Sequence, residues 1–422
     1  MTLALRLSQA GFDITLFEAS PKLGGLLGSM KIGDYTWDRF YHVILMSDTN
    51  TLSLLDELGL KDKVQWGTTK TGFYTDGKLY SMSNAIEFLT FPPLGLVDKL
   101  RLGASIFYAS RIKDWERLEE VTVSDWLIKL SGKRTFEKVW LPLLKSKLGE
   151  NYKITNAAFI WATIARMYAA RKAGLKQEMF GYVAEGYSTV LGKCEEALKK
   201  QGVKLAVGTA IRSVKNGKGV EVRTDAETVG FDSVILTGPC GQTAQISPEL
   251  SEMERARLRS VTYQGVICAA YLLKRPLGGY YITNITEKWV PFTAVIEMTA
   301  IVDKENFAGQ SLVYLPLYLD KSNPLWGQSD ERVNQVFFPA LQRMYPALSQ
   351  DDVVASTVCR AEDVMPVTTL NYSKDLLPPT QTSVKNVFIV NSAQIPNGTM
   401  NVNELVGHAN RKAAEIANLL KN

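Results

Sequence analysis

The sequence of 422 residues predicts an α/β fold that combines parallel strand–helix units with an antiparallel sheet and a set of helices. A helix, a glycine turn, a strand and an acidic residue follow one another within 1–18. Strand-like runs return beside helices at 203–236 and at 387–390. Between 265 and 315, four further strand-like runs are separated by proline-rich or polar turns, a pattern typical of antiparallel sheets.

The first stretch reads as half of a nucleotide-binding unit. Apolar residues from Ala4 to Leu7, followed by Gly11, predict an amphipathic helix that ends at a glycine. A short buried strand over 14–17 then leads to Glu18, and this order is the second half of a βαβ unit. The first half would be a strand and a G-x-G-x-x-G turn, which this chain does not contain. Because Ala4 fits the small residue that follows the third glycine, we expect Met1 to be an internal methionine of a longer reading frame.

Hydrophobic periodicity and turn residues divide the rest of the chain into local elements. Asp76-Gly77 is a strong turn dipeptide and predicts a β-hairpin over 63–82. From Ala85 to about Lys176 the pattern becomes mainly helical. The predicted helices span 50–60, 97–118, 123–130, 136–144, 154–172, 185–200, 248–260, 330–344 and 404–420, and the predicted strands span 203–206, 210–214, 220–224, 231–236, 265–273, 280–285, 292–299, 311–315, 353–360 and 387–390.

Composition argues against several classes of function. The net charge is only +5 and no run of five Lys or Arg occurs, so we expect no nucleic-acid partner. Four widely spaced cysteines without a C-x-x-C pair predict buried free thiols, and two histidines argue against a metal centre. We see no signal peptide and no apolar run of about 18 residues, so we expect a cytoplasmic protein without a transmembrane helix.

Three segments carry motifs that belong together. They read FEASPKLGGLLGS from Phe17, VKLAVGTAIRSV with FDSVILTGP between 203 and 239, and VFIVNSAQIPNGTMNVNELVGHANRKAAEIA from Val387. In this order and spacing they resemble the FAD-dependent superfamily of flavin amine oxidases, protoporphyrinogen oxidases and phytoene desaturases. The chain is therefore identified as a member of that superfamily that lacks the N-terminal strand and its G-x-G-x-x-G turn.

The resemblance implies an interleaved arrangement of two domains. A Rossmann-like FAD-binding domain would be discontinuous in sequence, and an α+β substrate-binding domain of antiparallel sheet and helices would fill the two insertions. The FAD-binding domain is expected at 1–62, 180–262 and 365–422, and the substrate-binding domain at 63–179 and 263–364.

The resemblance also implies a set of FAD contacts. These are expected at Glu18, Ala19, Ser20, Lys22, Gly24, Gly25, Leu26, His42, Ile211, Thr237, Gly238, Asn391, Thr399, Met400, Asn401 and Val402. The Glu18 carboxylate can accept hydrogen bonds from both ribose hydroxyls. Lys22 and the backbone N–H groups of the glycines can bind the ribose and the pyrophosphate. The alternatives are a surface glutamate after a strand and an ordinary flexible turn. Ile211 would pack near adenine, and a plain core role is an equal alternative.

The C-terminal motif departs from the family pattern at one point. Asn391 and Ser392 stand where relatives commonly have Gly-Asp, and an Asn can still bond a ligand oxygen without adding negative charge. The next helix would start near Thr399–Val402, and its positive end would favour an anionic reduced flavin. The alternative is a normally capped helix, with Asn401 or Asn403 as the N-cap.

Catalytic residues are less clear, and the candidates are His42, Tyr41 and Lys147. His42 lies where relatives place a loop by the flavin ring, although Phe40 fills a position that is usually glycine. It is similar to the loop histidine of UDP-galactopyranose mutase-like relatives, and a structural histidine is the alternative. Lys147 could meet an acidic substrate or could be a solvated surface lysine.

The leading hypothesis is an FAD-dependent oxidoreductase that passes a hydride from a small apolar or amine-bearing substrate to flavin N5. One alternative is a non-redox flavin-dependent mutase or isomerase of a nucleotide sugar or glycan precursor. Another is a degenerate, FAD-free scaffold, because the phosphate loop is missing.

A peripheral membrane contact is also expected from the segment 88–118. This segment is apolar with Lys99, Arg101, Arg111 and Lys113 interspersed, which suits a surface that lies on the cytoplasmic face of a membrane. The alternative is an amphipathic helix packed on the core with a solvated basic face.

Overall fold

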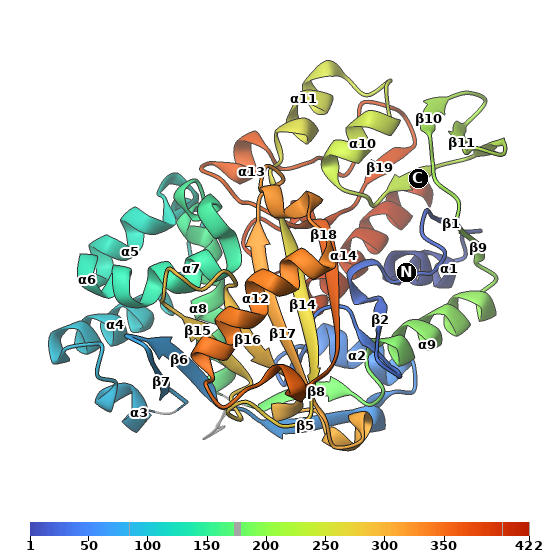
Figure 1. Cartoon of the computed structure of the whole chain (residues 1–422). Coiled ribbons are helices and arrows are strands. Elements are labelled where there is room, and N and C mark those ends of the chain that lie inside the picture. The colour runs from blue at the N-terminus through green and yellow to red at the C-terminus, as the bar shows by residue number, and fades with distance from the viewer. Residues whose placement is uncertain (84, 173–178, 399, 422) are drawn as a thin grey trace.

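The computed structural model describes residues 1–83, 85–172, 179–398 and 400–421. A seven-stranded sheet of order β18-β14-β17-β16-β15-β6-β7 runs through the middle of the molecule (Figure 1). Its neighbours are antiparallel except β15 and β6, which are parallel. Its strands are β6 (Thr71–Thr75), β7 (Lys78–Ser81), β14 (Tyr263–Leu273), β15 (Ile282–Ile285), β16 (Ala294–Glu297), β17 (Ser311–Leu319) and β18 (Val353–Pro366).

The centre of this sheet is β14, whose eleven residues are all buried. It pairs with β17 on one edge and β18 on the other, with Cys268 opposite Pro316 and Cys359. Helix α12 (Asp330–Met344) covers one face through Phe337 and Leu341. The opposite face packs on β2 (Ser29–Ile32) and β3 (Tyr35–Asp38).

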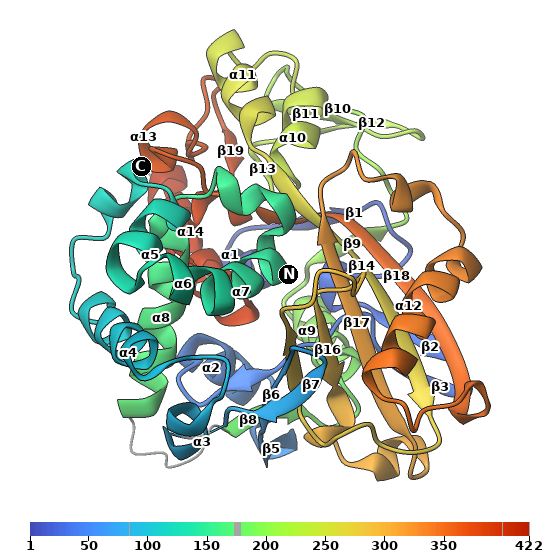
Figure 2. The ribbon, with the colours of Figure 1, turned by 60° about the vertical axis from the view of Figure 1, so that its left-hand side comes forward.

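A lobe of helices lies at one end of the sheet (Figure 2). Its members are α3 (Ala85–Thr90), α4 (Leu96–Ala109), α5 (Val123–Ser131), α6 (Lys133–Thr135), α7 (Leu141–Leu148) and α8 (Ala157–Lys172). Leu127, Leu144 and Ala157 are among the fully buried residues of their common core. Partly buried Met400, at the far end of the chain, also packs against this core.

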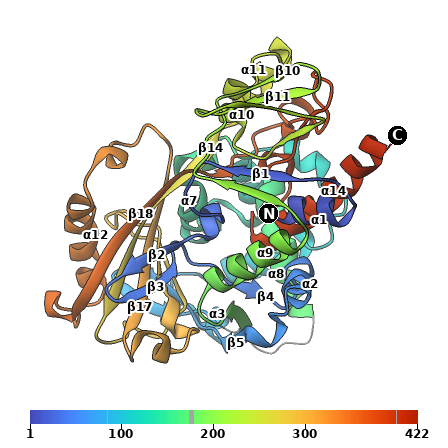
Figure 3. The same ribbon diagram turned by 90° about the vertical axis from the view of Figure 1, so that its right-hand side faces the viewer.

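Two further pairs of parallel strands lie outside the large sheet. Strand β1 (Thr15–Glu18) pairs with β9 (Lys204–Val207), and β13 (Val234–Leu236) pairs with β19 (Val387–Ile389). Around them lie α1 (Thr2–Gln9), α9 (Tyr187–Lys200) and α14 (Val402–Lys421). Figure 3 shows α1 beside α14, and the two helices share an apolar cluster that includes Leu7, Phe388 and Ile416. The two ends of the chain are therefore built into one layer with the parallel strands.

Shorter elements complete the fold. They are β4 (Ile44–Leu45), β5 (Val64–Thr68) and β8 (Met179–Val183) in one sheet, β10 (Ser213–Asn216), β11 (Val220–Arg223) and β12 (Thr228–Phe231) in another, and the helices α2 (Thr49–Glu57), α10 (Cys240–Ile246), α11 (Glu252–Ser260) and α13 (Tyr372–Asp375).

Most predicted elements are present, and several differ in detail. For example, the predicted helix over 136–144 is a π-helical turn followed by α7, and the predicted strand over 231–236 is divided between β12 and β13. Strand β5 pairs with β8 instead of joining the hairpin at Asp76-Gly77. The sequence could not show this pairing, because β8 lies more than 100 residues further along the chain. The predicted strand at 210–214 begins only at Ser213, so Ile211 precedes it. The predicted helix over 97–118 ends at Ala109. Helix α10, capped by Pro239, was not predicted.

All four cysteines are buried and carry free thiols, as their spacing predicted. Within the described residues, none of the helices combines the length and apolar character needed to cross a bilayer.

Candidate functional site

Glu18 lies at the carboxyl end of β1, where the chain makes a tight turn. One carboxylate oxygen accepts a hydrogen bond from the Ser20 backbone N–H at 2.8 Å. The backbone N–H groups of Gly208 and Thr209 donate to the carbonyls of Ser20 and Glu18, which ties the turn to the end of β9. Ala19 and Ser20 are exposed. Since a carboxylate has about four acceptor positions, Glu18 keeps capacity for ligand hydroxyls.

The glycine pair that follows is required for two different reasons. Gly24 has φ +120°, and a Cβ there would lie 2.4 Å from Leu191 Cδ1 on α9. Gly25 has φ +53°, and a Cβ there would meet nothing within 4 Å. Gly24 therefore permits close packing on α9, whereas Gly25 presents backbone to open space. Lys22 is exposed beside them, and Leu26 packs against the apolar cluster under β2 and β3.

Asn391 and Gly238 are brought together at the carboxyl ends of β19 and β13. The Asn391 Nδ2 donates to the Gly238 carbonyl at 3.0 Å, and its Oδ1 accepts from the Ala393 N–H at 3.0 Å. Asn391 is buried, while Thr237 at the end of β13 is exposed. Because ligands of parallel α/β sheets bind outside the carboxyl ends of the strands, this junction is a candidate ligand-binding position.

The start of α14 carries an unusual pair of caps. Asn401 Oδ1 accepts from the Glu404 N–H at 3.0 Å, so Asn401 caps α14. Of the two N-cap residues that the sequence offered, Asn401 and Asn403, this is the first. Asn403 Oδ1 instead accepts from the N–H groups of Asn50 and Thr51, and thus caps α2. Met400 adopts a positive φ of 47°. Thr399 lies outside the described residues, and the neighbouring Val402 packs in the cluster around α1 and α9.

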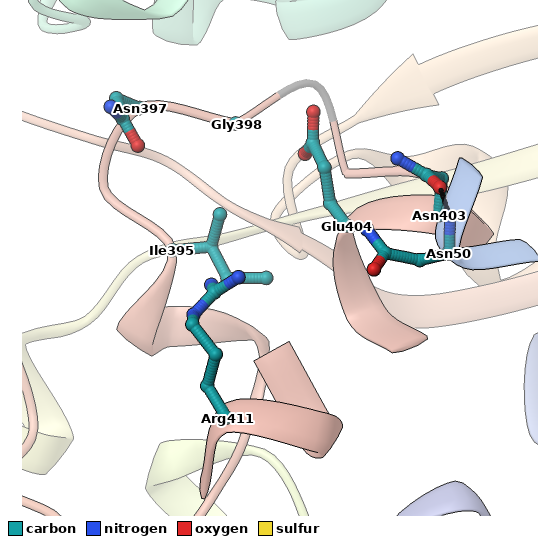
Figure 4. Close-up of a pocket in the computed structure, with 7 residues that line it drawn as sticks. All are labelled: Asn50, Ile395, Asn397, Gly398, Asn403, Glu404 and Arg411. Carbon is teal, nitrogen blue, oxygen red and sulfur yellow. Dashed lines mark hydrogen bonds between the residues drawn. The ribbon is translucent and has the colours of Figure 1, made fainter. Parts of the chain in front are cut away.

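A polar cavity of about 180 Å³ opens beside this helix start (Figure 4). It is lined by Asn50, Ile395, Asn397, Gly398, Asn403, Glu404 and Arg411. Figure 4 shows Glu404 and Arg411 projecting from the same helix while the Asn50 side chain comes from α2. Sequence reasoning missed Asn50 and Arg411, because a contact between α2 and α14 joins residues about 350 positions apart.

His42 follows β3 in a loop that runs toward β4. Its ring lies 5.5 Å from that of Tyr187 at the start of α9. Burial, together with the nearby Lys147 cation, lowers the pKa of His42 to about 4, so the ring is neutral at pH 7. Its Nδ1 is buried and has no hydrogen-bond partner within the part of the chain that the structure describes. A ligand group that forms a hydrogen bond with this nitrogen would satisfy it.

Tyr41, Tyr318 and Lys147 form a second cluster next to this loop. The two phenol oxygens lie 3.1 Å apart, and the Lys147 Nζ lies 5.8 Å from the Tyr41 ring centroid and 5.6 Å from that of Tyr318. Burial and the Tyr318 phenol raise the pKa of Tyr41, so it stays protonated at neutral pH. Lys147 is on α7 and exposed, but it is held over two rings and is not a fully solvated lysine.

Ile211 is separate from these clusters. It precedes β10 and packs, partly buried, in the apolar cluster of Val214 and Leu236. This packing agrees with the plain core role that was its alternative.

Comparison with known proteins places these features in a family. The model for flavin containing amine oxidoreductases matches residues 1–417. Protoporphyrinogen oxidase 2, chloroplastic/mitochondrial, of Arabidopsis thaliana is 27% identical over 126 residues, which are 28% of this chain and 25% of that protein. The match thus spans about a quarter of the length of that relative.

Solved structures show the same fold at low identity. A putative protoporphyrinogen oxidase from Exiguobacterium sp. 255-15 has a TM-score of 0.78 at 16% identity, covering 100% of this chain and 96% of the other. Cyclohexylamine oxidase from Brevibacterium oxydans IH-35A has a TM-score of 0.73 at 13% identity, covering 100% and 97%. A putrescine oxidase triple mutant has a TM-score of 0.78 at 18% identity, covering 100% and 96%. With the family match over nearly its whole length, the chain belongs to the flavin-containing amine oxidoreductase family.

Proposed function

We propose that the flavin is FAD and that the enzyme oxidises a small, predominantly apolar substrate. Two buried polar positions carry this proposal. They are Asn391, bonded to the Gly238 carbonyl, and the His42 Nδ1, which has no hydrogen-bond partner among the described residues. These groups belong to the parallel strands and to the loop that the family resemblance assigns to the cofactor. Bound FAD would supply a hydride acceptor at its N5 atom.

The chain's residues suit the two ends of a dinucleotide. Glu18 offers acceptor oxygens to ribose hydroxyls, and the exposed backbone at Gly25 leaves room for a ligand. At the other end, neutral His42 can accept or donate one hydrogen bond, depending on its tautomer. The helix start at Asn401 adds the positive end of a long helix dipole.

The aromatic cluster favours an apolar substrate over a protonated amine. Tyr41 and Tyr318 would offer an ammonium group their ring faces, but Lys147 already lies over both rings. A second cation there would meet repulsion from Lys147. An apolar substrate that carries a carboxylate or another hydrogen-bond acceptor fits this cluster better, because Lys147 can then pair with that group.

The first experiment tests the cofactor. The purified chain is examined for a flavin absorbance band, and the released cofactor is identified by mass spectrometry. FAD in stoichiometric amount is expected. FMN or no flavin would overturn the proposal, and the latter result would favour the FAD-free scaffold.

The second experiment tests the reaction with the flavin-loaded protein under anaerobic conditions. Apolar carboxylates are expected to bleach the flavin band, whereas putrescine and cyclohexylamine are not. Bleaching by the amines alone would overturn the substrate class. Turnover of a nucleotide sugar without net flavin reduction would instead support the mutase alternative.

A third experiment isolates Lys147. Lys147→Met removes the cation over the two tyrosines, and we expect KM for an apolar carboxylate to rise about tenfold with kcat little changed, because one charge-assisted contact of roughly 1.4 kcal/mol is lost. Lys145→Met is the matched control, since Lys145 is on the same helix but pairs with Glu150 at 3.1 Å. Equal effects of the two substitutions would show that Lys147 has no special role.

A further inference from the structure

Helix α4 has apolar residues on both sides, since Leu102 and Ala109 are buried in the core of the lobe while other large apolar residues face outward. Its outward side carries large apolar residues, with exposed fractions of 69% for Leu96, 63% for Val97 and 65% for Leu100. Its buried side includes two ionisable residues, Asp98 and Lys99. A helix at the surface of a globular protein normally places its polar residues outward.

The buried charges of α4 have partners within the lobe. Lys99 Nζ donates to the Leu89 carbonyl at 2.6 Å. Asp98 pairs with Arg134 at 3.3 Å and accepts from the Gly95 N–H. These contacts fix the orientation of the helix with its apolar side outward, since turning it over would leave two charges without their partners.

Neighbouring apolar side chains extend this face into a patch. We call it the α3–α4 surface, and it consists of Ile86, Leu89, Leu96, Val97, Leu100, Phe107 and Tyr108. Among the described residues, seven of the sixteen exposed large apolar side chains belong to it. Figures 1 and 2 show α3 and α4 at the outer rim of the helical lobe. Concentrated exposed apolar residues of this kind mark an interaction site.

The exposed charges beside the α3–α4 surface are mainly cations. Arg101, Arg111 and Lys113 are exposed, and the Arg111 guanidinium lies 4.7 Å from the Phe107 ring centroid. Three acidic groups of the same stretch have partners or are buried. Glu87 accepts from the Ser83 N–H and from Ser81, and Asp98 is buried. Exposed Asp114, just beyond the patch, pairs with Arg117 at 2.8 Å. The partner of this surface should therefore be both apolar and anionic.

We propose that the α3–α4 surface lies on an anionic phospholipid bilayer. Its apolar side chains would enter the interface between headgroups and acyl chains, while Arg101, Arg111 and Lys113 meet lipid phosphates. A second copy of the chain fits less well, because a symmetric contact would set the same cations against each other. This inference is independent of the substrate proposed above.

Flotation with vesicles tests the proposal on the whole 422-residue chain. Binding is expected to vesicles of equal parts phosphatidylcholine and phosphatidylglycerol, and to fall at least tenfold with Leu100→Glu combined with Phe107→Glu. Met253→Glu is the control, because Met253 is 72% exposed on α11, outside the patch. It should bind like the wild type. Equal loss in the control, or no binding by the wild type, would overturn the proposal.

Two further readouts separate lipid from protein partners. Substituting glutamine at Arg101, Arg111 and Lys113 together should weaken binding to the anionic vesicles by roughly fivefold for each charge. Light scattering measures the oligomeric state of the wild type and of Leu100→Glu. If the wild type is a dimer and the variant a monomer, the α3–α4 surface binds a second copy of the chain and the bilayer proposal is wrong. Leu100→Cys also offers a selective site for a fluorescent label, because the four native thiols are buried. Its fluorophore should shift to the blue on anionic vesicles, and an unchanged spectrum would contradict the proposal.

Discussion

Strands β14 and β1 show how differently the two halves of this molecule are held. Strand β14 has eleven residues, all buried, and hydrogen bonds to a neighbour on each edge. Strand β1 has four residues, all only partly buried, and its pairing is with β9. The large sheet therefore has its own apolar core, whereas the parallel strands bury much less surface. Because burial of apolar area is the main source of stability, we expect the cofactor side to depend more on its ligand.

The largest expected effect concerns one buried carboxylic acid. Asp38 at the end of β3 is buried and accepts from the Tyr187 N–H at 2.8 Å. Burial raises its pKa to about 7, against the lowering effect of that hydrogen bond. The folded state thus holds a proton that the unfolded state releases near pH 4, so the contribution of Asp38 to stability is lost as the pH rises from about 4 to 7.

Asp38→Asn should remove this dependence while keeping an acceptor for Tyr187. The free energy of unfolding of the variant minus that of the wild type should increase by on the order of 4 kcal/mol from pH 4 to pH 8. Urea unfolding at several pH values measures this difference. Parallel stability curves for the two proteins would contradict the raised pKa.

The next largest effect compares the strands directly. Ile267 of β14 is fully buried, so Ile267→Ala should reduce the free energy of unfolding by about 3 kcal/mol. The matched change on the other strand, Leu16→Ala, should cost only about 1 kcal/mol, because Leu16 is partly exposed. Chemical denaturation measures both values. Equal losses would show that β1 is as well packed as β14.

The last prediction concerns local stabilisation by the cofactor, which is smaller than the effect at Asp38. FAD at a hundred times its dissociation constant should stabilise the protein by about 2.7 kcal/mol. Hydrogen exchange should then slow in β1, β13 and the start of α14, with little change in β14. Slowing spread evenly over the large sheet would remove the distinction between the two halves.

Local features of the sequence predicted much of the fold. Gly11 after α1, the turn at Asp76-Gly77 and the long final helix were found because helix period and turn chemistry are encoded within a few residues. The pairing of β5 with β8 and the parallel pairing of β15 with β6 were not found, because the partners are more than 100 residues apart.

The candidate site divides in the same way. Glu18, Gly24 and Asn391 could be proposed from the sequence because each lies in a contiguous motif that follows a predicted strand, and their roles stay predictions. The meeting of Tyr41 with Tyr318 joins a loop to β17 across 277 positions, and Lys147 reaches them from a third element. Spacing along the chain carries no signal for such contacts, since they arise when the helical lobe docks on the sheet.

The sequence by itself determined where most helices and strands occur and that the thiols would be buried. It did not determine which side of α4 faces out. Alternation of apolar residues with Asp98 and Lys99 suits either orientation of a helix. Only the tertiary structure decided this, because Arg134 and the Leu89 carbonyl satisfy the two charges inside the lobe and leave Leu96, Val97 and Leu100 at the surface.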